Sequence, residues 1–134
     1  MITYEDFAKV EIKAGKILSA EKIPDTDKLL KLFVDFGPIS VQPVADISVE
    51  GVPVAKVEMQ EVARDIRQIV SGISMYFPDP QSLVGKVCMF VTNLEPRKIK
   101  GFESNGMLFA LSTEDGKFSL LEPNKDIPEG TKAK

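Results

Sequence analysis

The stretch that decides the fold runs from Val10 to Glu21 and reads VEIKAGKILSAE. Its apolar residues alternate as in a β-strand, and an extended segment would place on one face Val10, Ile12, Ala14, Lys16, Leu18 and Ala20. The alternation is imperfect at Lys16 and Ile17. Gly15 in the middle of a strand indicates a sharp bend or a bulge, as at the corner of a barrel. A long, bent first strand is typical of small β-barrels.

Short segments with strand character, separated by turns, continue along the chain. Thr3, followed by two acidic residues, predicts a short helix from Tyr4 to Lys9. The predicted strands are Lys28 to Asp35, Arg67 to Ile73, Lys86 to Asn93, Gly106 to Ser112 and Lys117 to Leu121. We expect Met75 to Phe77 to be extended and Pro80 to Val84 to form a short helix. The tail after Leu121 has the Pro and Gly residues of a loop that packs across the domain.

These elements place the chain in the all-β class. Short strands joined by turns, with only small helices, are typical of a Greek-key barrel. The oligonucleotide-binding (OB) fold fits best, because this five-stranded barrel has a long curled first strand and a helical connection between its third and fourth strands. An additional β-hairpin is predicted in residues 38–66, with strands Val44 to Val49 and Val52 to Val62. We expect one domain, residues 1–134, that carries this inserted hairpin.

Composition narrows the possible chemistry. The chain has 134 residues, 43% of them hydrophobic, which is enough for one core without metals or disulfides. It has no histidine, which excludes zinc sites of the usual Cys/His kind and removes the commonest general base. Its single cysteine, Cys88, lies in an apolar run and is interpreted as a buried, inert thiol. Catalysis would therefore have to rest on carboxylates or lysines, and we expect no metal or cofactor.

The sequence also predicts a location. No apolar run approaches the roughly 20 residues needed to cross a membrane. The first twelve residues, MITYEDFAKVEI, lack the basic-then-apolar order of a signal peptide. We therefore expect a cytoplasmic protein that does not associate with membranes.

Charge is distributed unevenly along the chain. The formal net charge of −3 would by itself argue against a nucleic-acid partner. Residues 38–66, however, contain two basic and five acidic side chains, which accounts for the whole imbalance. Residues 86–104 contain four basic and two acidic side chains. The acidity thus comes from one segment, and a basic surface elsewhere remains compatible with RNA.

The basic segment continues into the stretch Asn93 to Leu108, NLEPRKIKGFESNGML. Three basic side chains and two glycines lie here between apolar runs, as in a surface that contacts a ligand. Composition alone favours the alternative, a β-hairpin with a solvated, lysine-bearing loop. The remaining motifs of the chain decide between these interpretations.

Four motifs in one order resemble the tRNA-binding domain family, over residues 4–37 and 67–134. They are Phe7-x-Lys9-Val10-x-Ile12-x-x-Gly15-x-Ile17, Asp27-Lys28-Leu29, Arg67-Gln68-Ile69-Val70-Ser71-Gly72-Ile73 and Asn93-Leu94-x-Pro96-Arg97-Lys98-x-x-Gly101-x-x-Ser104-x-Gly106-Met107. The chain is most similar to the form found at the C-terminus of methionyl-tRNA synthetases or as their separate beta subunit. It also resembles free-standing structure-specific tRNA-binding proteins and secretion-chaperone members. Residues 38–66 depart from the family pattern.

The resemblance implies an OB barrel whose terminal extensions pair two subunits into a homodimer. It also implies RNA contacts at the basic tip, Arg97, Lys98 and Lys100, where the alternative is solvated side chains. Asn93 is expected to contact a base or ribose, or else to cap a turn. In the groove, Ser104 would offer a hydroxyl to phosphate and Met107 an apolar surface to a base, unless Met107 belongs to the core.

Two strands supply further candidates for RNA contact. Arg67 and Ser71 are four residues apart and so face the same side of a strand. The Arg67 guanidinium suits a bidentate contact with phosphate, and an ion pair with Asp65 or Glu61 is its competing use. Lys28 and Lys31, on the second strand, are weaker candidates.

The function that these observations favour is a non-catalytic tRNA-binding module. It would recognise the shape and backbone of tRNA and assist methionyl-tRNA synthetase in trans. The alternative is a chaperone-like dimer that binds unfolded or exported polypeptides in an apolar groove. A carboxylate-based enzyme comes third, because Asp25 and Asp27 lie in a turn beside Lys28, where capping or solvation explains them.

Overall fold

A computed structural model describes residues 1–39 and 63–134 of the chain. The elements are α1 (Tyr4–Ala8), β1 (Ile12–Lys22), β2 (Leu30–Pro38), β3 (Arg64–Ser71), η2 (Ser74–Tyr76), η3 (Pro80–Leu83), β4 (Val87–Val91), β5 (Arg97–Ile99), β6 (Phe102–Ser104), β7 (Met107–Leu108), β8 (Ala110–Ser112) and β9 (Phe118–Leu120). The hairpin predicted at residues 44–62 falls outside the described residues. β2 and β3 extend into the predicted insertion, as far as Pro38 and from Arg64.

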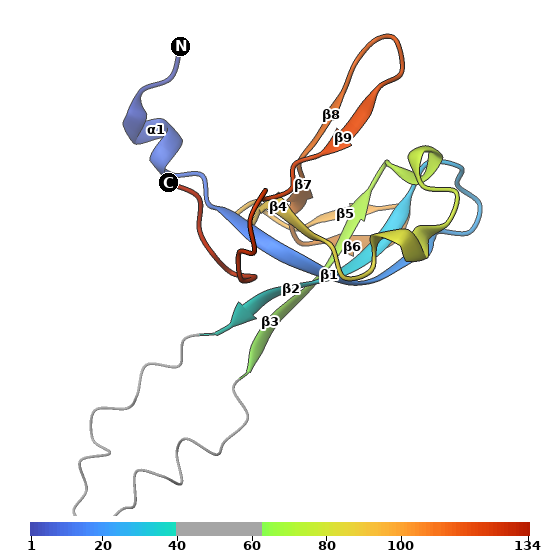
Figure 1. Cartoon of the computed structure of the whole chain (residues 1–134), viewed down its shortest axis with the longest axis horizontal. Helices are drawn as coiled ribbons and strands as arrows, with labels where there is room; N and C mark the ends of the chain where they lie inside the picture. The colour runs from blue at the N-terminus through green and yellow to red at the C-terminus, as the bar shows by residue number, and fades with distance from the viewer. Residues whose placement is uncertain (40–62) are drawn as a thin grey trace, which may run out of the picture.

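Five antiparallel strands form a curled sheet in the order β3-β2-β1-β4-β7 (Figure 1). The far edge of β3 meets the chain that leaves β6, since the Asn105 N–H donates to the Gln68 carbonyl at 2.9 Å. The 3-10 helix η3 lies between β3 and β4, as the OB topology requires. The architecture is therefore the predicted all-β, OB-like barrel.

β1 bends where the sequence pattern was imperfect. Its pairing with β2 shifts between Ile17 and Ser19, which is a β-bulge. Ile17 is buried while Lys16 and Leu18 are exposed, which explains the imperfect alternation noted at Lys16 and Ile17: the inward face changes at the bulge. Gly15 has a different role from the predicted bend. A Cβ at Gly15 would lie 2.6 Å from the Phe36 side chain, so glycine allows β2 to pack closely against β1.

Two other predictions about local structure need correction. Met75 is not extended, because Ser74–Tyr76 forms the 3-10 helix η2. The predicted strand from Gly106 to Ser112 is broken at Phe109, whose N–H donates to the Met89 carbonyl at 3.1 Å. β7 before this break pairs with β4, and β8 after it pairs with β9 in a hairpin that projects from the barrel (Figure 1).

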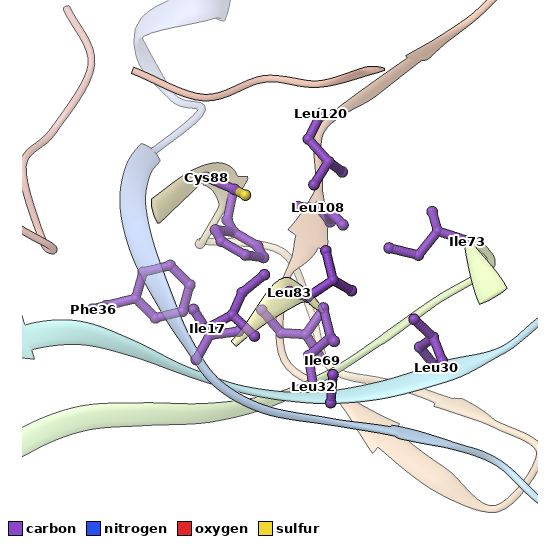
Figure 2. Close-up of a cluster of buried hydrophobic side chains, with 13 residues drawn as sticks. Ile17, Leu30, Leu32, Phe36, Ile69, Ile73, Leu83, Cys88, Leu108 and Leu120 are labelled. Atoms are coloured by element: carbon purple, nitrogen blue, oxygen red, sulfur yellow. The ribbon is translucent and has the colours of Figure 1, made fainter. Parts of the chain in front are cut away.

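The barrel interior holds the core. Inward side chains of every long strand meet there, and Ile17, Leu32, Ile69 and Phe90 are fully buried (Figure 2). Cys88 belongs to this cluster, as predicted. Burial, helped by the negative charge of Glu122, raises the pKa of the Cys88 thiol to about 12. The thiol is therefore neutral, and unreactive as a nucleophile, at physiological pH.

The C-terminal tail packs across the barrel, as predicted. Its Thr131 carbonyl accepts from the Ala14 N–H at 2.9 Å, and its Ala133 N–H donates to the Ile12 carbonyl at 2.8 Å. The tail thereby follows the N-terminal half of β1. Within residues 1–39 and 63–134, no helix is long and apolar enough to cross a membrane.

Candidate nucleic-acid interface

The basic stretch forms the β5–β6 hairpin. Arg97 pairs with Ser104, Lys98 with Glu103 and Ile99 with Phe102. The two-residue turn between the strands, Lys100 and Gly101, has positive φ values of 52° and 85°. Two positive φ angles are typical of a type I′ turn, which matches the twist of the flanking strands. Glycine at the second position is the local signal for this turn.

The cations of the hairpin are accessible. Arg97, Lys98 and Lys100 are exposed. The ion pairs among residues 1–39 and 63–134 involve none of the three. Their charges are therefore available to a ligand, which suits contacts with phosphates.

A small cavity of about 100 Å³ lies beside the hairpin, between it and β3. Ser104 and Met107, both predicted to line a groove, are among its lining residues, together with Val70, Leu94, Glu95, Arg97, Ile99 and Gly106. The Met107 side chain is 46% exposed, so it presents apolar surface and is not part of the core.

The hydroxyl of Ser104 is used inside the protein. Ser104 is 5% exposed, its Oγ accepts from the Val70 N–H at 3.0 Å, and its O–H donates to the Gly106 carbonyl at 3.1 Å. The first bond joins the hairpin to β3, and the second fixes the chain that leaves β6. The geometry thus favours a positioning role over the direct phosphate contact expected from the sequence.

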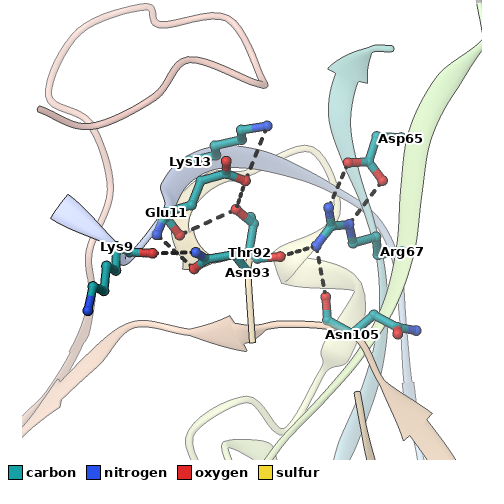
Figure 3. Close-up of polar contacts among 8 residues, drawn as sticks. All are labelled: Lys9, Glu11, Lys13, Asp65, Arg67, Thr92, Asn93 and Asn105. Carbon is teal, nitrogen blue, oxygen red and sulfur yellow. Dashed lines mark hydrogen bonds and ion pairs between the residues drawn. The ribbon is translucent and has the colours of Figure 1, made fainter. Parts of the chain in front are cut away.

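Arg67 clamps the base of the hairpin segment. Its Nη1 donates to the carbonyl of Thr92 and, at 3.3 Å, to that of Asn105, so one nitrogen joins the chain entering the segment to the chain leaving it (Figure 3). Its Nε and Nη2 each donate to the Asp65 carboxylate at 3.0 Å. Of the two uses weighed from the sequence, the structure contains the ion pair with Asp65. Ser71 lies about 13 Å farther along β3 and is not brought to this clamp.

Asn93 ties the hairpin segment to the N-terminal chain. Its Oδ1 accepts from the Glu11 N–H at 2.7 Å and its Nδ2 donates to the Lys9 carbonyl (Figure 3). Beside it, the Thr92 hydroxyl donates to the Glu11 carboxylate at 2.6 Å. This hydrogen bond, assisted by the charge of Lys13, lowers the pKa of Glu11 despite its partial burial. Asn93 therefore joins two segments that lie far apart in the sequence. This role differs from both the turn cap and the RNA contact that the sequence suggested.

Lys28 lies on the other side of the hairpin tip. An open cavity of about 490 Å³ lies between the hairpin tip and the turn that joins β1 to β2. Its lining residues are Asp25, Thr26, Asp27, Lys28, Leu29, Ile99 and Lys100. Lys28 and Lys100 thus border one space, although they are 72 positions apart in the sequence. Lys31 lies farther along β2, where its Nζ is 3.5 Å from the Glu21 carboxylate.

The sequence reasoning did not single out Phe33, a half-exposed aromatic residue on the outer face of β2. The signal was present in Lys28 to Asp35, KLLKLFVD, because strict alternation places Lys31 and Phe33 on the face opposite Leu30, Leu32 and Val34. OB folds use this region, the face of the second and third strands and the loops beside it, to bind oligonucleotides. The exposed cations of the hairpin tip therefore adjoin a surface that is suited to a nucleic acid.

Comparison with known proteins identifies relatives of this chain. The family model described as "Putative tRNA binding domain" matches residues 48–132, more than half of the chain. The methionine–tRNA ligase of Methanospirillum hungatei is 44% identical over 98% of this chain, and that of Enterococcus faecalis is 33% identical over 96%. These matches cover 15% and 16% of the two ligases, so the chain spans only a small part of their length.

Solved structures show the same fold. A methionyl-tRNA synthetase (MetRS) related protein from Pyrococcus horikoshii superposes with a TM-score of 0.74 at 35% identity, over 99% of this chain and 97% of that one. The chaperone CsaA from Bacillus anthracis superposes with a TM-score of 0.71 at 25% identity, over 100% and 99% of the two chains. Together with the match to the family model, these similarities show that the chain belongs to the tRNA-binding domain family.

Proposed function

We propose that this chain is a non-catalytic module that binds tRNA in the cytoplasm and assists methionyl-tRNA synthetase in trans. One observation carries the proposal: the cations Arg97, Lys98 and Lys100 are exposed on a hairpin of an OB-like barrel in this family, and they form no ion pair with residues 1–39 or 63–134. The similarity to methionine–tRNA ligases supports the choice of synthetase. The module holds tRNA near the synthetase and raises its effective concentration there.

The residues of the interface have two kinds of role. The three hairpin cations and Lys28 contact phosphates, and Met107 offers apolar surface to a base. Arg67, Asn93 and Ser104 hold the hairpin segment in place through their internal hydrogen bonds. Ser71 and Lys31 lie on the adjoining strands. Because most contacts are with the backbone, the module recognises the shape of tRNA more than its sequence.

The proposal predicts binding that depends on salt. In titrations of labelled tRNA, affinity should fall as salt rises, and Lys98→Ala should weaken binding and make the slope of log K against log salt shallower by about 1. Lys117→Ala is a matched control, because Lys117 is also an exposed lysine of a β-hairpin but lies on the β8–β9 hairpin. Absence of tRNA binding at low salt would overturn the proposal.

We also propose that the chain is a homodimer. The N-terminal segment exposes the large apolar side chains of Met1, Ile2, Tyr4, Phe7 and Val10. Exposed apolar surface of this kind is characteristic of a protein contact. The resemblance to this family implies that terminal extensions pair two subunits. The partner that covers this surface is therefore a second copy of the chain.

The alternative function is that of a chaperone-like dimer which binds unfolded or exported polypeptides. The similarity to the chaperone CsaA favours it. Apolar contacts persist in salt that screens contacts with phosphate. Peptide binding that survives high salt, without any binding of tRNA, would therefore select this alternative.

A further inference from the structure

The N-terminal segment, residues 1–11, is attached to the barrel at one place. Residues 1–10 are exposed, and Glu11 is the first residue along the chain that is partly buried. Within residues 1–39 and 63–134, every hydrogen bond between this segment and the rest of the chain involves Thr92 or Asn93 (Figure 3). These two residues follow β4 and lead into the hairpin segment, Asn93 to Leu108, which carries the proposed RNA contacts.

Thr92 forms hydrogen bonds in both directions from this junction. It is 4% exposed. Its N–H donates to the Glu11 carbonyl at 2.8 Å, and its hydroxyl donates to the Glu11 carboxylate at 2.6 Å. Its carbonyl accepts from Arg67 Nη1, which also donates to the Asn105 carbonyl at 3.3 Å. Because Asn105 follows β6, these bonds connect the N-terminal segment to both ends of the β5–β6 hairpin.

The bond between Thr92 and Glu11 has an ionised acceptor, and such bonds are stronger than those between neutral groups. The Thr92 hydroxyl is the main cause of the lowered pKa of Glu11, and the charges of Lys13 and Lys132 act in the same direction against the effect of burial. Removing this buried hydroxyl leaves the carboxylate without its donor at the junction. The junction thus depends on one directed bond that can be deleted without a change of side-chain size.

We propose that Thr92 is a positioning residue that couples the N-terminal segment to the RNA-binding hairpin. With the junction bonds formed, Arg67 and the two ends of the hairpin are held in one arrangement. With the bonds broken, the segment and the hairpin move independently. A ligand that binds the joined form better shifts the population toward it, and the coupling between two sites is reciprocal.

Two consequences follow from this coupling. Binding of tRNA at the hairpin orders the N-terminal segment, and anything that orders the segment, such as a second copy of the chain, strengthens tRNA binding at each hairpin. The inference rests on the proposed tRNA-binding function and adds the regulation of that same site.

The test compares Thr92→Val with Thr92→Ser. Valine has the shape of threonine without its hydroxyl, so Thr92→Val should weaken tRNA binding by about fivefold to twentyfold, and Thr92→Ser should restore the affinity. Titration of Glu11 by NMR reports the bond itself, because Thr92→Val should raise the Glu11 pKa. Thr113→Val is the matched control: the Thr113 hydroxyl also donates to a carboxylate, that of Asp115, but on the β8–β9 hairpin. It should leave tRNA affinity unchanged.

Hydrogen exchange tests the reverse direction of the coupling. The N–H groups of Phe7 and Val10 bond within the N-terminal segment, to the carbonyls of Thr3 and Phe7. Saturating tRNA should slow their exchange in the wild type and not in Thr92→Val. Protection that persists in Thr92→Val would show that RNA covers the segment directly, and it would overturn the coupling.

The remaining outcomes distinguish this inference from the function on which it rests. If Lys98→Ala weakens tRNA binding and Thr92→Val does not, the coupling is overturned while the RNA-binding function stands. If Thr92→Val accelerates exchange of the core amides of Ile69 and Phe90 as much as that of the hairpin, Thr92 acts through overall stability and the coupling is overturned. If the wild-type protein does not bind tRNA at low salt, both proposals are overturned.

Discussion

Arg67 stabilises the interface through bonds inside the protein. Replacing it with Met leaves the Thr92 and Asn105 carbonyls and the Asp65 carboxylate without their donor. Such losses typically lower the free energy of unfolding by about 1–3 kcal/mol. We therefore expect Arg67→Met to lower the urea midpoint and to weaken tRNA binding together. Arg67→Lys keeps the positive charge but lacks the planar fork of donors. It should therefore recover only part of the lost stability and tRNA affinity. A midpoint equal to that of the wild type would contradict the clamp.

For single residues, the sequence indicated which side chains belong to the interface region better than it indicated which groups they bind. Residue type and motif position selected Arg67, Asn93 and Ser104. The Asp65 partner of Arg67 is two positions away and was one of the uses weighed from the sequence. Other hydrogen bonds of these three side chains reach residues 25 to 84 positions away, and no local pattern encodes such partners. The exposed hairpin cations were easier to identify, because exposure at a turn follows from local chemistry.

The β5–β6 hairpin has a turn whose two residues can be tested separately. Lys100 adopts a positive φ that glycine accepts freely, so Lys100→Gly should preserve or slightly raise stability while it removes one charge. The salt slope of tRNA binding should then become shallower by about 1. Unchanged tRNA affinity and slope would show that Lys100 does not contact phosphate.

Gly101→Ala tests the other half of the same turn. No atom of residues 1–39 and 63–134 beyond its chain neighbours lies within 4 Å of a Cβ built at Gly101, so the expected penalty is that of its φ of 85°. A left-handed residue other than glycine costs about 1–2 kcal/mol. We expect faster hydrogen exchange of the hairpin amides and weaker tRNA binding, with the charge unchanged. Exchange as slow as in the wild type would show that the turn geometry does not support the hairpin.

Elements were predictable where one physical signal dominated. Alternation located β1, strand-forming residue types located β2 and a continuous apolar run located β4. The chemistry of Asp115-Gly116 located the turn before β9. A bend or bulge in β1 was predicted at Gly15, and the structure places the bulge two residues later, between Ile17 and Ser19. The break at Phe109 was not predicted, because it arises from pairing with a strand elsewhere in the chain.

The molecule as a whole separates its proposed RNA face from its terminal segments. The hairpin cations lie on β5 and the β5–β6 turn, whereas exposed apolar side chains gather on α1 and the residues around it. The sequence predicted the barrel and the location of the basic face. The sequence could not predict how subunits pair. An apolar residue at the surface of one subunit gives the same sequence pattern whether it faces solvent or a second subunit.

The homodimer is tested by removing this apolar surface. Tyr4 is 81% exposed and Phe7 also projects outward, so changing both to Ser should leave the barrel folded. If a second copy covers them, the wild type should sediment at twice the mass of one chain, and the double variant should dissociate at micromolar concentrations. Leu111→Ser is the control, since Leu111 is 63% exposed on the projecting β8–β9 hairpin. Two linked RNA faces bind more tightly than one, so the monomeric variant should also lose tRNA affinity. A wild-type protein that remains monomeric at the highest concentration measured would rule out the dimer.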